Sequence, residues 1–478
     1  MIDKFSSSKP FKFVSRLFLS VLFVTLLLPI INAPLHGDDL ISPFNYYLEY
    51  DGKLRNYLLN FSLSFDGHFN FLGEIFGALW LDFWISILVQ TNSIYQFIMA
   101  YRIFKILVML LFLLLAMKLN RMVFPNLSLG LTGFYTLLSF LMITVYHTNW
   151  SSDPVGNYPL TGYLSTSIGV IYIILLQSKK LDNRIYVNLA IIVVAVLYYE
   201  INIGLIAVLL YYLKPKLGTK KIVLITVALI SIAFCTYLLL LAPNAYSGGQ
   251  LSLSWKFFYS FFLQLISIFP PITFPLAIYF SKITIVSSLI FSMLLFTISR
   301  KLVKNLNDSR NVQNITLKNK KIFTFNDTEK LLLIYFVTSC FILALSKKYQ
   351  NEIVIPGQVY MSFTSGQLLF IVYLTRILIE FYHVRKLSQF WMVVIIASSI
   401  GFQNYSLVNK LNERSSFSQD VLYSWNEPIE ERCNAVKNFN SYKLDRSYMA
   451  NFQVSFSKIF YDIKSESYCK EIKPYAKK

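Results

Sequence analysis

The sequence predicts an all-α, polytopic membrane protein with about 11 transmembrane helices. Hydrophobic residues make up 55% of the 478 residues and charged residues only 14%, whereas soluble proteins average about 25% charged residues. The charge deficit is concentrated in long apolar stretches, and about 20 apolar residues suffice to cross a bilayer. The net charge of +19 is then explained by Lys and Arg on cytoplasmic loops. This composition argues against a nucleic-acid partner.

The N-terminal part contains a first span, an external loop and an amphipathic segment. The apolar run 17–31 follows several basic residues and is interpreted as an uncleaved span whose N-terminus is cytoplasmic. The loop 34–71 is then external. In the next segment, 72–88, Glu74 and Asp82 favour an interfacial helix over a span. Further spans are expected at 103–117, 128–146 and 163–177.

The stretch 185–213 is flanked by Lys and Arg on both sides, which indicates that both of its ends are cytoplasmic. It is too short for two full crossings of about 20 residues each. We therefore expect two short helices with Tyr198-Tyr199-Glu200 at their turn, since broken helices are tolerated at membrane depth where they line a cavity. The alternative is a single span, which would place the C-terminal tail inside the cell.

The rest of the chain completes a transmembrane domain at 1–404, followed by a small periplasmic tail at 405–478. The aromatic segment 255–269 is expected at the outer interface. Cys433 and Cys469 both lie in the tail, where an oxidising compartment would let them pair. The later spans are expected at 222–242, 281–299, 331–346, 364–383 and 389–406.

Adjacent carboxylates in the first external loop are the candidate catalytic groups. Either Asp38 or Asp39 could accept the proton of an acceptor hydroxyl while the other orients the reactants. The alternative is that the pair only solvates the loop or caps a helix. The pair could also bind a divalent cation beside a phosphate, although no complete set of metal ligands is visible and no other cofactor is implied.

Three further charged residues are candidates for substrate binding. Lys347 and Lys348 lie in a predicted external loop, against the positive-inside trend, and could hold a lipid headgroup or a departing phosphate. The alternative for them is ordinary snorkelling at the interface. Glu200 lies at the outer end of the predicted helix pair. A carboxylate near the membrane interior is costly, so its presence there favours a functional role.

This arrangement resembles the type C membrane glycosyltransferase superfamily. The resemblance is carried by His36-Gly37-Asp38-Asp39 after the first span, by Tyr199-Glu200 in the short helix pair, and by Pro356-Gly357 in the late external loop. The overall length and the short external tail are most similar to the glucosyltransferases of bacteria and their phages that modify the O-antigen of lipopolysaccharide. Gln358 departs from the pattern, because relatives are expected to carry a basic residue there.

The resemblance implies a polyprenyl-phosphate-linked sugar as donor and an O-antigen glycan as acceptor, on the periplasmic face of the bacterial inner membrane. By the same resemblance, Asp38 or Asp39 would be the general base, while Lys347 and Lys348, together with Glu200, would bind the substrate and its phosphate.

Two other functions remain open at this stage. An O-antigen polymerase or ligase is also polytopic and uses lipid-linked glycans. A transporter or flippase of such glycans would need charged residues within its spans. Arg376 and Glu380 are candidates for that role, although they lie one helical turn apart and could pair locally.

Overall fold

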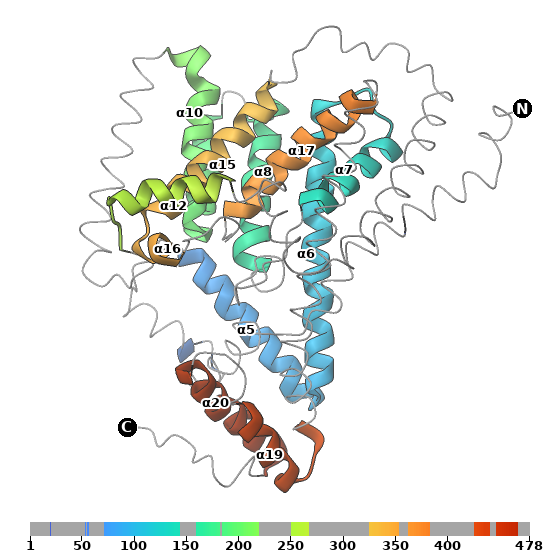
Figure 1. Cartoon of the computed structure of the whole chain (residues 1–478), viewed down its shortest axis with the longest axis vertical. Coiled ribbons are helices and arrows are strands. Elements are labelled where there is room, and N and C mark those ends of the chain that lie inside the picture. Colours follow the sequence, from blue (N-terminus) through green and yellow to red (C-terminus); the bar gives the residue numbers. More distant parts are fainter. Residues whose placement is uncertain are drawn as a thin grey trace, which may run out of the picture.

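The described part of the protein is a bundle of helices with a smaller helical pair at one end (Figure 1). Within it, extended backbone pairs only at one antiparallel bridge, between Leu251 and Ser346. The all-α prediction is thus confirmed for these residues. The computed structural model describes residues 20, 53, 55–56, 71–143, 159–181, 184–218, 250–266, 325–352, 362–382, 425–439 and 446–466.

Two of the described helices, α6 (Ile94–Val123) and α15 (Asp327–Leu345), are long and apolar enough to cross a membrane. At 1.5 Å per residue, the 30-residue α6 is about 45 Å long, more than the hydrocarbon core of about 30 Å. It therefore extends well beyond the predicted span 103–117. The count of about 11 spans stays a prediction, because the segments 17–31, 222–242, 281–299 and 389–406 lie outside the described residues.

The predicted interfacial segment forms a 21-residue helix, α5 (Phe71–Thr91). The chain turns at Asn92, so that α5 packs against α6. Aromatic rings join the two helices: Trp80 contacts Phe104 with 3.8 Å between ring centroids, and Trp84 contacts Tyr101 at 5.0 Å. The segment is thus one arm of a helical hairpin (Figure 1).

The central bundle buries a mixed apolar and aromatic core. It is formed by residues such as Phe112 of α6, Phe134, Tyr172, Tyr335 and Leu368. These lie on α6, α7 (Leu129–Ile143), α8 (Ser165–Gln177), α15 and α17 (Ser362–Tyr382). The π-helical turn η1 (Pro159–Leu164) leads directly into α8.

Small polar side chains bind the bundle helices to one another. Asn120 of α6 donates to the hydroxyls of Thr136 on α7 and Thr375 on α17, at 2.9 and 3.1 Å. Ser139 shares a further hydrogen bond with Thr375. Such interhelical bonds are a common means of helix association in membranes, where helix contacts gain little from the hydrophobic effect.

The predicted pair of short helices is confirmed. Helices α9 (Ile185–Tyr198) and α10 (Gly204–Leu217) have 14 residues each and are separated by Tyr199 and the 3₁₀ turn η2 (Glu200–Ile203). Each is about 21 Å long, shorter than the hydrocarbon core. One continuous helix across the segment is thus excluded, while the side of the membrane on which each end lies stays a prediction.

Helices α12 (Trp255–Ile266) and α16 (Lys347–Glu352) both contact α15 and each other. In the tail, α19 (Ile429–Phe439) and α20 (Arg446–Lys464) lie near the α5–α6 turn (Figure 1). The Trp425 indole N–H donates to the Asn92 carbonyl at 3.4 Å. Cys433 is disulfide-bonded, while its predicted partner Cys469 lies outside the described residues.

Candidate functional site

Three of the five candidate site residues fall within the described chain. Glu200 opens the turn η2, and Lys347 and Lys348 open α16. The predicted catalytic pair, Asp38 and Asp39, lies outside the described residues. The described candidates therefore belong to the substrate-binding part of the predicted site.

Glu200 is held at a break in the helical backbone. The preceding Tyr199 is extended, with φ −160° and ψ 129°, which ends α9, and Glu200 then starts the 3₁₀ turn. The Glu200 side chain is half-buried.

Asn202 provides the polar contacts that stabilise this break. Its side-chain amide donates to the Ala195 carbonyl at 2.9 Å and to the Ser165 hydroxyl at 3.0 Å. The Tyr335 hydroxyl donates to Asn202 Oδ1 at 2.7 Å. The fully buried Asn202 thus joins η2 to α8, α9 and α15, and its amide is a second donor to the Ala195 carbonyl, which also accepts the Tyr199 N–H at 3.0 Å.

Lys347 and Lys348 lie at the start of α16, which is hydrogen-bonded to residues 250–252. The Lys347 N–H donates to the Gln250 carbonyl at 2.9 Å, and the Ser252 N–H donates to the Leu345 carbonyl at 2.8 Å. The buried Gln350 donates to the carbonyls of Ser252 and Ala344, at 2.6 and 2.8 Å. These bonds fix the start of α16 against the segment that precedes α12.

A compact apolar cluster brings the two segments together. It contains Tyr199 and Ile201, which flank Glu200, and Tyr349, which follows the two lysines. Tyr198 of α9, Leu263 of α12 and Leu343 of α15 are the other buried members of the cluster. The chain neighbours of Glu200 and those of the two lysines, which are far apart in sequence, therefore pack in the same cluster.

Two of the lysines near this cluster contact neutral amide oxygens, and a third lies beside an aromatic ring. Lys347 Nζ lies 3.3 Å from Gln250 Oε1, and Lys348 Nζ lies 5.9 Å from the centre of the Tyr349 ring. Lys256 of α12, which the sequence analysis did not single out, donates to Asn351 Oδ1 at 3.1 Å. An ammonium group such as that of Lys347 can bind the oxygens of a phosphate.

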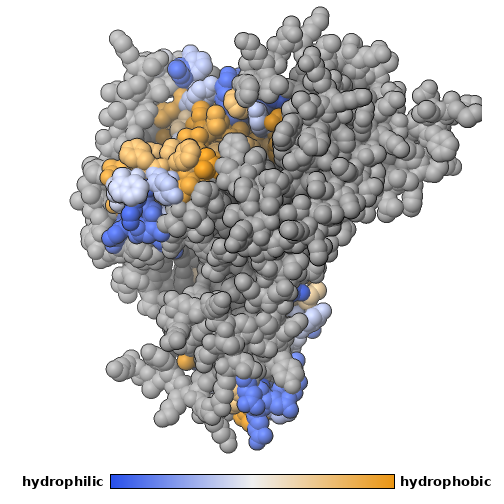
Figure 2. Space-filling view, viewed as in Figure 1, coloured by the Kyte–Doolittle hydropathy of each residue, from blue (hydrophilic) through white to orange (hydrophobic). Residues whose placement is uncertain are grey.

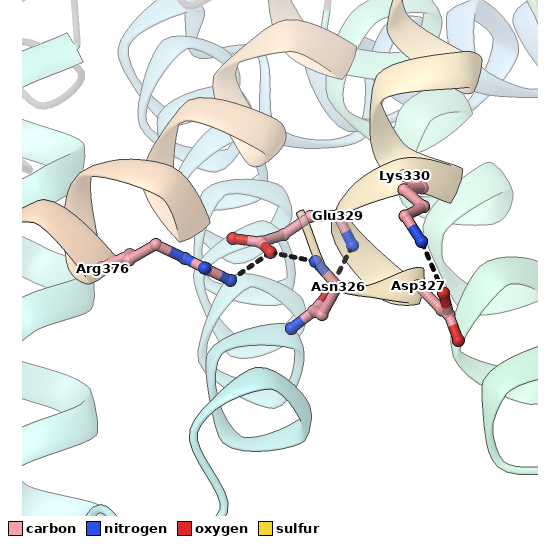
Figure 3. A network of polar contacts seen from close by, with 5 residues as sticks. All are labelled: Asn326, Asp327, Glu329, Lys330 and Arg376. Carbon is pink, nitrogen blue, oxygen red and sulfur yellow. Dashed lines mark hydrogen bonds and ion pairs between the residues drawn. The ribbon is translucent and has the colours of Figure 1, made fainter. Parts of the chain in front are cut away.

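Arg376, a candidate for a transport pathway, pairs with Glu329 and not with the expected Glu380. Arg376 of α17 forms an ion pair with Glu329 of α15, and both side chains are buried (Figure 3). Glu329 Oε2 also accepts from the Asn326 N–H at 2.7 Å, while its own N–H donates to Asn326 Oδ1 at 2.9 Å. The expected local pairing with Glu380 thus missed an interhelical contact, and the Glu380 side chain lies outside the described residues.

That ion pair has the environment of a structural element. Glu329 and Asn326 form a capping box at the N-terminus of α15. The Arg376 guanidinium also lies 6.0 Å from the centre of the ring of Phe124, the C-cap residue of α6. The nearby pair of Lys330 and Asp327 is exposed (Figure 3). The buried pair therefore ties together the neighbouring ends of α6, α15 and α17.

The described residues contain no group of three or more His, Cys, Asp or Glu that could hold a metal ion. In comparisons with known proteins, no family model, curated protein or solved structure matches the chain.

Proposed function

We propose that the protein is a polytopic glycosyltransferase of the bacterial inner membrane. It transfers a hexose, with glucose the first candidate, from a polyprenyl-phosphate donor to an O-antigen repeat on the periplasmic face. The observation that supports this proposal most is that the chain neighbours of Glu200 and of Lys347 and Lys348 meet in one apolar cluster, which includes Leu343 of a candidate spanning helix. A lipid-linked phosphate needs this combination of cations and an adjoining apolar surface.

In the proposed reaction the acceptor hydroxyl loses its proton to Asp38 or Asp39. Its oxygen forms a bond to the anomeric carbon of the donor sugar, and the bond between that carbon and the phosphate oxygen breaks. The polyprenyl phosphate leaves with the electron pair of that bond. Lys347 and Lys348 would stabilise the growing phosphate charge, while Glu200 would bind the sugar.

The test compares lipopolysaccharide from cells with and without the gene, by mass spectrometry of the released glycan. The proposal expects a gain of one hexose for each repeat unit. An altered chain length with unchanged repeats would instead identify a polymerase, and unchanged glycan in a host with a suitable O-antigen would contradict transfer.

Variants then assign the residues. Asp38→Asn and Asp39→Asn are expected to prevent hexose addition while the protein still reaches the membrane. Lys347→Gln is expected to weaken donor binding, whereas Lys458→Gln on α20, away from the cluster, serves as the matched control. Full activity in both aspartate variants would overturn the assignment of the base.

The transporter alternative depended on charges within the spans. Arg376 is neutralised by Glu329 and lies in a capped helix junction. This geometry favours a structural role for the residue and gives the transporter alternative no specific support.

A further inference from the structure

Helix α12 presents two different faces. Phe257, Ser260 and Leu263 are buried against the bundle. The other face exposes aromatic side chains at helical spacing, with 72% exposure for both Trp255 and Phe258 and 58% for Phe262. An exposed aromatic stripe on a helix of three turns is costly in water, because it leaves a large apolar area unburied.

The position of α12 is set by ring contacts with a candidate spanning helix. Phe257 and Phe261 pack against Phe341 of α15, with 5.2 and 6.1 Å between the ring centroids. Phe341 lies one turn before the end of α15 at Leu345. In Figure 1, α12 runs crosswise to α10 instead of along it. A helix with this direction, at the end of a span, lies where the span leaves the hydrocarbon.

A positively charged patch borders the aromatic stripe. Lys256 and Lys347 reach the side-chain oxygens of Asn351 and Gln250, which are neutral amides, so these contacts leave the lysine charges uncompensated. Figure 2 shows hydrophobic side chains over α12 and a hydrophilic patch next to them, in the region of α16. The combination of apolar stripe and adjacent cations matches the boundary between acyl chains and lipid phosphates.

We infer that α12 and the start of α16 form a membrane-surface element, in which the Trp255–Phe258–Phe262 stripe enters the headgroup boundary and Lys256 binds lipid phosphate. Tyr and Trp favour this layer because their rings are amphipathic. A cation there gains from the negative charge of anionic lipids. The inference does not depend on sugar transfer, and Lys256 has no part in the proposed reaction.

The depth of the stripe is measured on the full-length protein in vesicles of phosphatidylcholine and phosphatidylglycerol. Spin labels replace Phe258, Phe262 and, as the control, the 58%-exposed Tyr461 of α20. We expect the first two labels to collide more with oxygen than with a water-soluble nickel chelate, and the label at 461 to show the reverse. Nickel accessibility at 258 and 262 equal to that at 461 would overturn the insertion of the stripe.

The contact with phosphate is tested separately. Protein extracted from the same vesicles is analysed for its ratio of bound phosphatidylglycerol to phosphatidylcholine. Lys256→Gln is expected to lower this ratio up to about fivefold, the effect of one cation near an anionic surface, while Lys458→Gln leaves it unchanged. An unchanged ratio in Lys256→Gln would overturn the role of Lys256. Because neither measurement uses sugar transfer, a failed transferase assay would not affect this inference.

Discussion

The Tyr335 hydroxyl of α15 donates a 2.7 Å hydrogen bond to Asn202 Oδ1, two residues after Glu200. Both side chains are fully buried. Through this bond a long candidate spanning helix holds the turn between two short ones, so the position of Glu200 depends on contacts that its own segment does not supply.

The variant Tyr335→Phe removes this hydroxyl and leaves Asn202 Oδ1 without its donor. The free energy of unfolding should fall by about 0.6–2 kcal/mol, the range for buried polar contacts in membranes and cores. Thermal denaturation in detergent measures the loss. Tyr211→Phe, at a half-exposed site on α10, is the matched control, and equal stability of the two variants would contradict the role of the bond.

Gly169 of α8 is required beside the same hydrogen bond. A Cβ atom there would lie 2.6 Å from the Tyr335 hydroxyl and 3.2 Å from Asn202 Oδ1. Gly169→Ala should therefore displace the bond and lower the free energy of unfolding by about 1–3 kcal/mol. The same change at Gly77 of α5 meets no atom within 4 Å, so Gly77→Ala should stabilise by about 0.5–1 kcal/mol. Denaturation midpoints that shift in the same direction for both variants would refute this.

The sequence predicted the broken segment well because two simple quantities decide it. Cations on both sides of 185–213 favour ends on the same side of the membrane, and the length of the segment then permits only short helices. The extent of α6 was underestimated, since the residues of 94–102 are less uniformly apolar than 103–117. Their place in the helix is determined by packing against α5, through contacts such as Trp84 with Tyr101 and Phe97, which hydropathy does not report.

At the candidate site, the sequence identified the charged residues but not the hydrogen-bonding residues that hold them in place. Lys347, Lys348 and Glu200 stand out by their charge and their place relative to the spans. Gln350 and Asn202, which fix them, are neutral amides whose importance comes only from tertiary hydrogen bonds. Arg376 was paired with its neighbour on the helix, because sequence spacing reveals partners one turn away and not partners on another helix.

The buried ion pair allows a clean test of charge without loss of the cap. In Glu329→Gln the side chain can still accept the Asn326 N–H in a capping box, but the Arg376 charge loses its partner. Removing one member of a buried pair costs about 3–5 kcal/mol, measured as a lower denaturation midpoint in detergent. The double variant Glu329→Gln with Arg376→Met should recover most of this loss. Asp327→Asn, in the exposed pair with Lys330, should change stability little, and a loss as large as that of Glu329→Gln would argue against burial as the cause.

Trp425 joins the tail to the rest of the protein. It is 1% exposed, packs against Phe456 and Phe460 with 5.5 and 5.3 Å between ring centroids, and donates to the Asn92 carbonyl at the α5–α6 turn. Trp425→Ala removes the ring from this position, at a cost of about 3–5 kcal/mol for a buried aromatic residue. Because the lost contacts are those of the tail, we expect faster proteolysis at α19 and α20, while α6 and α15 stay protected. Tyr461→Ala, on the exposed side of α20, should be cleaved at the wild-type rate. Equal cleavage of the Trp425→Ala and wild-type tails would show that the tail is held by other contacts.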